Sequence, residues 1–209
     1  MKTLWTFGCS HTQGHGLPDC VDSKGDPLNK ISQLAWPNHL GELMNIPVIN
    51  NSHAGIGPKA VWNNIINSNI QPGDVVVIMW PCWESRVDLL IDPGAKSDHA
   101  LQIKAIRAWN EEDESYFDNY YQQYDRWIEY HLLARHIQDN YSNNIKLIQT
   151  VYDEYQTKPG LPPSLHVEFT QIAFGMDKYC SMPKASDNEH NGLEAHQAFA
   201  NDLYTEAFC

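Results

Sequence analysis

The chain has 209 residues, of which 42% are hydrophobic and 11% aromatic, so it carries enough apolar material for one globular domain and too much for a disordered chain. Its formal net charge is −12, from 26 acidic and 14 basic residues. Because no cluster of Lys or Arg stands out, we expect no nucleic-acid partner and no anionic membrane surface. No run approaches the roughly 20 apolar residues of a transmembrane helix.

The cysteines indicate a reducing compartment. Their number is odd and their spacing irregular, and no CxxC pair occurs, so neither a disulfide framework nor a zinc ribbon is indicated. The first residues contain an apolar run that is too short for a signal peptide. We therefore expect a cytoplasmic protein, with incorporation into a virion as the alternative. The five cysteines are Cys9, Cys20, Cys82, Cys180 and Cys209.

Four short apolar runs predict β-strands. They are rich in β-branched residues and lack polar alternation, which is typical of parallel strands buried on both faces. The runs cover residues 4–7, 46–50, 74–80 and 145–152.

Helix-like segments separate these strands, at residues 31–45, 56–69, 115–140 and 192–207. In 115–140 the apolar residues Ile128, Leu132, Leu133 and Ile137 recur at helical spacing. The alternation predicts an α/β fold, a three-layer α/β/α sandwich with a mostly parallel, flavodoxin-like sheet. We expect a single domain over residues 1–209, with a helical, aromatic insertion at about 92–140. That insertion is either a lid beside the site or, as we favour, an amphipathic helix against the domain or a partner subunit.

Ser10 follows the first predicted strand directly, in "TLWTFGCSHTQGHG". Sites in such sheets form at the carboxyl ends of strands. Acyl transfer by a serine needs a base, a carboxylate that orients the base, and donors for the oxyanion. Asp187 and His190 lie three residues apart before the last predicted helix, and Gly55 follows the second strand.

The order of these blocks resembles the SGNH hydrolases, also called GDSL-type esterases and lipases. The blocks are Gly8-Cys9-Ser10 with Gly14, Asn50 with Gly55, a strand ending in Trp80, and Asp187-x-x-His190. The resemblance implies that Ser10 is the nucleophile, His190 the base and Asp187 its orienting carboxylate. It also implies that the amides of Ser10 and Gly55 are oxyanion donors, and that no cofactor or metal is needed.

Two departures from the family pattern stand out. Cys9 replaces the usual aspartate, and the block that supplies an oxyanion asparagine in the family reads "MWPCWESRVD" here, without an asparagine. This version, with Trp80 and Arg86, resembles a divergent branch common in phage and environmental sequences. Asn51, Trp80 and Arg86 are candidate substrate-binding residues. Arg86 alternatively pairs with Glu84 or Asp88.

We therefore expect a serine-dependent hydrolase of a small-molecule or carbohydrate ester, such as a carbohydrate O-acetyl group. The alternative is a non-catalytic SGNH-like binding protein or phage virion structural protein, as a homo-oligomer or with a virion partner. A phosphodiesterase is disfavoured by the negative charge. A metal site formed by His11, His15, His190 and His196 is disfavoured because no HExxH motif or carboxylate-rich partner accompanies them.

Overall fold

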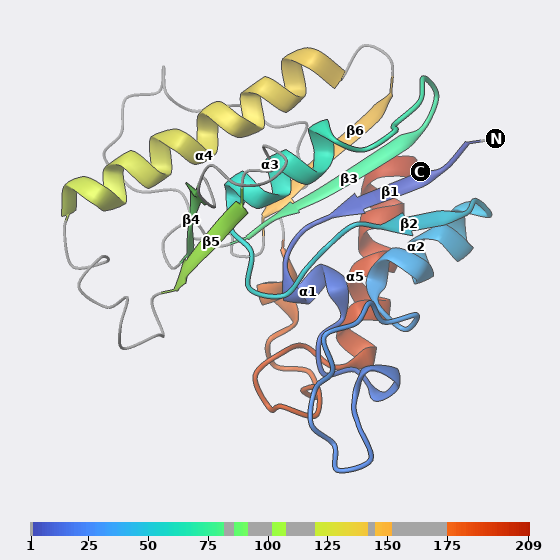
Figure 1. Ribbon diagram of the computed structural model, residues 1–209. Helices are drawn as coiled ribbons and strands as arrows, with labels where there is room; N and C mark the ends of the chain where they lie inside the picture. The colour runs from blue at the N-terminus through green and yellow to red at the C-terminus, as the bar shows by residue number, and fades with distance from the viewer. Residues whose placement is uncertain (1, 82–85, 92–101, 108–119, 142–144, 152–174) are drawn as a thin grey trace.

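The computed structural model describes residues 2–81, 86–91, 102–107, 120–141, 145–151 and 175–209. Its central feature is a four-stranded, all-parallel sheet with strand order β2-β1-β3-β6 (Figure 1). This order is that of flavodoxin-like doubly wound sheets, so the predicted fold class is confirmed. The strands are β1 (Leu4–Phe7), β2 (Val48–Asn50), β3 (Val75–Trp80) and β6 (Lys146–Val151).

Strand β2 is shorter than the predicted 46–50. The amide of Ile46 donates to the carbonyl oxygen of Gly41 at the end of the preceding helix, so residue 46 belongs to the helix end. The carbonyl oxygen of Pro47 then accepts the amide of Leu4, which begins the parallel pairing with β1. The helix end therefore sets where the strand can start.

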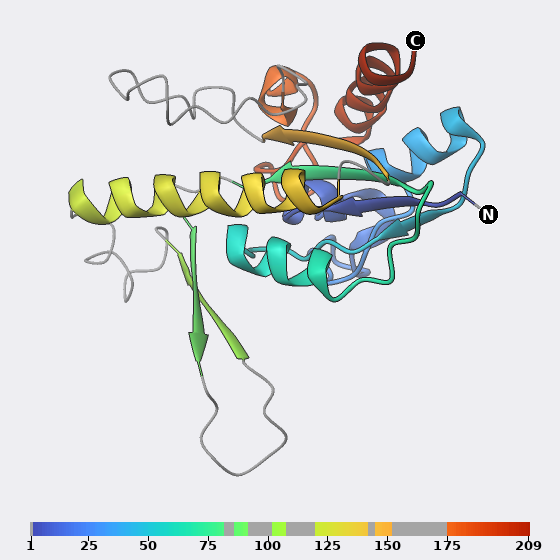
Figure 2. The same ribbon diagram turned by 90° about the horizontal axis from the view of Figure 1, so that it is seen from above.

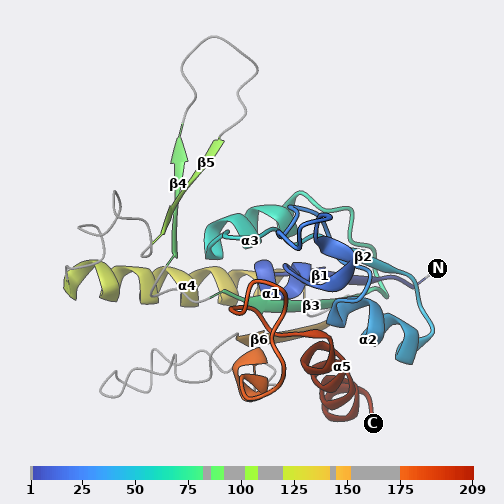
Figure 3. The ribbon, with the colours of Figure 1, turned by 90° about the horizontal axis from the view of Figure 1, so that it is seen from below.

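Helices cover both faces of the sheet, as Figure 3 shows. In β3 every residue is buried, because Val75, Val77 and Met79 face one helical layer while the alternate residues face the other. The first layer holds α2 (Trp36–Met44) and α5 (Leu193–Phe208), and the second holds α3 (Pro58–Ile66) and α4 (Tyr120–Tyr141). This is the predicted three-layer sandwich.

Helix α4 corrects one detail of the predicted core. Ala134 and Ile137 are buried against the sheet, but Leu132 is 63% exposed. A helix face spans residues three and four apart, so Leu132 falls outside the stripe that contains Ala134 and Ile137. The first residues of the helix predicted from residue 115 lie outside the described residues.

An antiparallel pair of strands, β4 (Arg86–Ile91) and β5 (Gln102–Arg107), was not predicted. Figure 2 shows the pair projecting away from the three layers. The predicted insertion at about 92–140 contains β5 and α4. The rest of it lies outside the described residues.

Within the described part of the chain, no helix is long and apolar enough to cross a membrane. Cys9 and Cys20 are buried, Cys180 and Cys209 are exposed, and all four are free thiols. Cys82 lies outside the described residues.

The turn from β1 into the short helix α1 (Ser10–Gln13) is very tight. A side chain at Gly8 would place its Cβ 2.1 Å from Thr12 Oγ1 and 2.9 Å from the carbonyl oxygen of Met79. Only glycine fits there. This close approach holds α1, and Ser10 at its start, against the carboxyl edge of the sheet.

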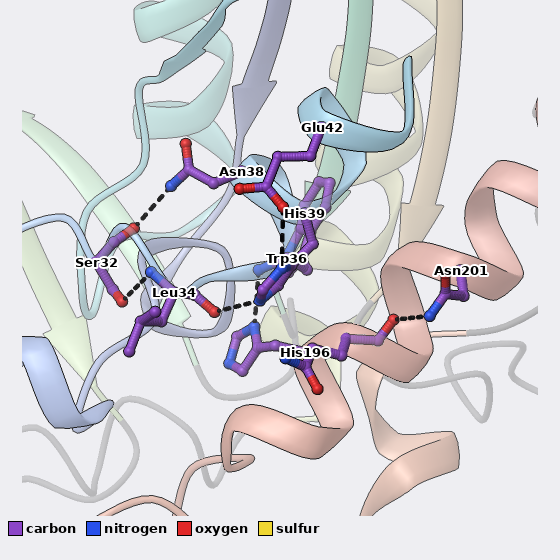
Figure 4. Close-up of polar contacts among 9 residues, drawn as sticks. Ser32, Leu34, Trp36, Asn38, His39, Glu42, His196 and Asn201 are labelled. Atoms are coloured by element: carbon purple, nitrogen blue, oxygen red, sulfur yellow. Dashed lines mark hydrogen bonds and ion pairs between the residues drawn. The ribbon is translucent and has the colours of Figure 1, made fainter. Parts of the chain in front are cut away.

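His196 links helix α5 to the start of helix α2. The Nδ1 atom of His196 accepts a hydrogen bond of 3.1 Å from the backbone amide of Trp36, at the start of α2 (Figure 4). His196 is 1% exposed, and burial, reinforced by the neighbouring His39 and His190, lowers its pKa to about 3. The neutral ring therefore fixes α5, and the residues just before it, against α2.

Because His196 is buried, we predict that the folded protein loses stability as the pH falls. The unfolded chain binds a proton at His196 near its ordinary pKa of 6.5, whereas the folded chain does so only near 3. Stability is therefore full above pH 6.5 and falls between these two values, by up to about 1.4 kcal/mol per pH unit. In His196→Asn the side-chain oxygen still accepts from Trp36 but does not titrate. Urea unfolding at a series of pH values should give a flatter pH dependence for the variant, and parallel curves would contradict the assignment.

Candidate active site

Ser10 stands at the carboxyl end of β1, as the first residue of α1. Its side chain is nearly buried, at 4% exposure. Its Oγ atom lies 2.8 Å from Nε2 of His190, although the two residues are 180 positions apart in the sequence. The fold thus brings the first and last predicted blocks into direct contact.

His190 is held by a compact turn that begins at Asp187. One carboxylate oxygen of Asp187 accepts the backbone amides of Glu189 and His190, each at 3.0 Å. The other oxygen lies 2.6 Å from His190 Nδ1. Asn188 makes the turn possible with a φ of 59°, in the left-handed region that asparagine tolerates. The three-residue spacing therefore serves both the turn and the side-chain contact.

The ionisation of Asp187 indicates which atom donates in the contacts between Asp187, His190 and Ser10. Burial acts to raise the pKa of Asp187, but the hydrogen bonds from His190 and Glu189 outweigh it and keep the pKa below its ordinary value. The ionised carboxylate can only accept, so Nδ1 of His190 donates to it. In the tautomer with its proton on Nδ1, Nε2 accepts the hydroxyl proton of Ser10. This is the arrangement that a general base requires.

Gly16 joins the two halves of the site. Its carbonyl oxygen accepts the amide of Ser186 at 3.0 Å, directly beside Asp187. Its φ is +77°, and an added Cβ would lie 3.1 Å from the Cβ of Ala185 and 3.2 Å from Oδ2 of Asp187. A glycine here lets the chain turn after α1 and lets the carboxylate come close.

A cavity of about 370 Å³ opens over Ser10 and His190. Gly55, with a φ of 74°, lines it from the segment between β2 and α3. Among the described residues, the amides of Ser10 and Gly55 donate no hydrogen bond. The other lining residues are His11, His15, Ala54 and Glu189.

His11 and His15, considered from the sequence only as metal ligands, line this cavity. Their rings lie 4.7 and 5.1 Å from the ring of His190, measured between centroids. Burial, together with His190, lowers the pKa of His15, against the opposing influence of Asp187 and Glu189. The available signal was their position one and five residues after Ser10. In the described part of the chain, no group of three His, Cys, Asp or Glu side chains has a metal-holding arrangement.

Two of the three candidate substrate-binding residues lie away from this cavity. Asn51 donates its side-chain amide to Ser68 Oγ at 3.1 Å. Trp80 is fully buried in the layer with α3 and α4, and its Nε1 donates to Gln149 Oε1 at 2.8 Å. Neither residue is therefore among the described residues that line the cavity. Arg86 begins β4, and its side chain lies outside the described residues.

No protein-family model matches the sequence, and no curated protein sequence matches it. Among solved structures, the chain is similar to a carbohydrate esterase whose active site displays divergent catalytic and non-catalytic binding functions, with 12% identity and a TM-score of 0.49. It is also similar to an acetyl xylan esterase from the rumen bacterium Butyrivibrio proteoclasticus, with 15% identity and a TM-score of 0.45. In both cases the match covers 98% of this chain and 64% of the other.

A third similar structure is an extracellular lipase from Streptomyces rimosus, with 11% identity and a TM-score of 0.34 over 98% of this chain and 74% of that one. The structural neighbours named here are therefore esterases and a lipase.

Gly16 offers a direct test of how the site is held. In Gly16→Ala the added methyl group meets Ala185 and Asp187, and we expect it to displace the carboxylate from His190. Gly25→Ala is the matched control, because Gly25 also has a positive φ, of +89°, but nothing lies within 4 Å of its added Cβ. Both variants should lose about 1–2 kcal/mol of stability from the left-handed backbone.

The readout is the downfield proton NMR resonance of the His190 Nδ1–H that donates to Asp187. We expect this resonance to shift or vanish in Gly16→Ala and to persist in Gly25→Ala. An unchanged resonance in Gly16→Ala would show that Gly16 does not position Asp187.

Proposed function

We propose that the protein is a serine-dependent ester hydrolase that acts through an acyl-Ser10 intermediate. The observation that carries this proposal is the unbroken set of contacts from Asp187 through His190 to Ser10, at 2.6 and 2.8 Å, beneath an open cavity. A structural serine would need neither an oriented imidazole nor a cavity. A nucleophilic serine needs both.

In the proposed first half-reaction, Ser10 Oγ attacks the acyl carbon while its proton passes to His190 Nε2. The tetrahedral intermediate collapses, and Nε2 returns that proton to the oxygen of the leaving alcohol. A water molecule then attacks the acyl carbon and gives a proton to His190 Nε2. The bond between the acyl carbon and Ser10 Oγ breaks, Nε2 returns the proton to Oγ, and the carboxylic acid departs. Asp187 stays ionised throughout and stabilises the imidazolium. Every proton in these steps is handled by protein groups and water, so the proposal includes no cofactor.

The amides of Ser10 and Gly55 are the proposed oxyanion donors. Both residues line the cavity, and neither amide is used elsewhere within the described residues. The residue that ends β3, where the resemblance leads one to look for a further donor, is the buried Trp80 with its Nε1 already bonded to Gln149. A missing donor costs on the order of 10²–10³ in rate in other serine hydrolases. We therefore expect slow turnover of simple esters.

The size of the cavity favours small substrates. A space of about 370 Å³ accommodates an acetyl or short acyl group with part of its alcohol. We propose a small carboxylic ester, with a carbohydrate O-acetyl group as one member of that class.

The test is hydrolysis of p-nitrophenyl acetate and butyrate by the purified protein, together with labelling by a fluorophosphonate. Ser10→Ala should lose on the order of 10³-fold or more in kcat and should not be labelled. Ser186→Ala is the control, because Ser186 is exposed beside Asp187 but does not line the cavity over Ser10. It should behave as wild type.

Equal activity in wild type and Ser10→Ala would contradict the proposal. Absence of both turnover and labelling in a folded protein would favour the rival, a non-catalytic binding or virion protein.

A further inference from the structure

The proposed reaction fixes which side of the cavity takes the alcohol part of the ester. His190 Nε2 must deliver its proton to the leaving oxygen, so that oxygen lies within hydrogen-bond distance of Nε2. Groups attached to this oxygen therefore lie beside the residues that surround the His190 ring. Within the described residues these include Glu189, which precedes His190, and His11 and His15, whose ring centroids lie 4.7 and 5.1 Å from that of His190.

Glu189 is well placed to act on such a group. Its backbone amide is fixed by the 3.0 Å hydrogen bond to Asp187 Oδ1, and Glu189 lines the cavity. Glu189 is exposed, and no described hydrogen bond or ion pair engages its carboxylate. The backbone is therefore held while the charge remains available to a ligand.

The charged side chains described around this part of the cavity are negative. Glu189 lines it and Asp187 lies directly behind His190, so two carboxylates contribute. No Lys or Arg is found among its described lining residues. His15 adds no positive charge at neutral pH, because burial and the neighbouring His190 lower its pKa. The local field therefore attracts cations and repels anions.

We propose that Glu189 is a specificity-determining residue, and that it makes the site prefer esters whose alcohol part is positively charged over esters whose alcohol part is anionic. This inference rests on the proposed ester hydrolysis and adds the charge of its substrate. It places the selection on the alcohol side of the scissile bond, because Glu189 adjoins the group that protonates the leaving oxygen. The acyl group lies on the side of Gly55 and Ala54.

The experiment compares three acetate esters of the same phenol framework. They are 3-(trimethylammonio)phenyl acetate, its neutral isostere 3-tert-butylphenyl acetate, and 3-carboxyphenyl acetate. We expect kcat/KM, corrected for the spontaneous reactivity of each ester, to fall in that order. The cation-to-anion ratio should drop roughly fivefold in Glu189→Gln and reverse in Glu189→Lys, and added salt should weaken it.

Glu206→Gln is the matched control. Glu206 is exposed near the carboxyl end of α5, so this variant removes the same charge away from the cavity. It should keep the wild-type ratio. A general effect of net charge would instead lower the ratio equally in Glu189→Gln and Glu206→Gln, and that result would overturn the assignment to Glu189.

The proposed ester hydrolysis and the proposed charge selection are contradicted by different results. If the neutral ester is hydrolysed but the ratio is the same in wild type and Glu189→Gln, the charge selection is wrong while the ester hydrolase stands. If wild type hydrolyses none of the three esters and Ser10 takes no fluorophosphonate label, both the hydrolase and the selection are contradicted.

Discussion

The site depends on one constraint, which is that the two ends of the chain meet at the carboxyl edge of the sheet. Ser10 and His190 are 180 positions apart, so their hydrogen bond exists only if α1 and the turn before α5 are held in register. The Gly16–Ser186 backbone hydrogen bond joins them directly beside Asp187. The buried hydrogen bond from the Trp36 amide to His196 joins α2 to α5, the helix that follows this turn. The site is therefore a product of long-range packing and not of a local motif.

The contacts of Cys9 explain why the fold accepts a cysteine at position 9. Cys9 is fully buried, and its carbonyl oxygen, rather than its side chain, accepts the amides of Thr12 and Gln13 at the start of α1. The side chain at this position packs into the interior and does not line the cavity. The departure from the family pattern at Cys9 thus falls on a packing role. The second departure has a different weight, because the residue that ends β3 is Trp80, whose side chain is buried in the core and does not line the cavity.

Much of the fold could be predicted because parallel strands buried on both faces leave a strong signal. The run that forms β3 is apolar at every position, since each residue faces one helical layer or the other. The β4–β5 pair was missed because it is a two-stranded ribbon outside the main sheet, without such a continuous apolar run. The exposed position of Leu132 was missed because helical spacing alone does not say which of two neighbouring stripes faces the sheet.

Only part of the proposed site could be predicted from the sequence. Ser10, Asp187 and His190 could be singled out because each stands at a recognisable junction of a strand or helix. His11, His15 and Glu189 could not, because their place in the cavity depends on how α1 packs against a turn far along the chain. For the same reason the sequence did not show that Asn51 and Trp80 do not line the cavity. Proximity to a strand end does not tell which side of the sheet edge a side chain takes.

The most direct test of the central claim is to quench wild-type protein with acid during turnover of p-nitrophenyl acetate and measure the intact mass and the peptide map. The account predicts a fraction of the protein heavier by one acetyl group, located on the peptide that contains Ser10, which disappears once the substrate is exhausted. Turnover without any acetylated protein, or with the acetyl group on His190 or another residue, would contradict an acyl-Ser10 intermediate.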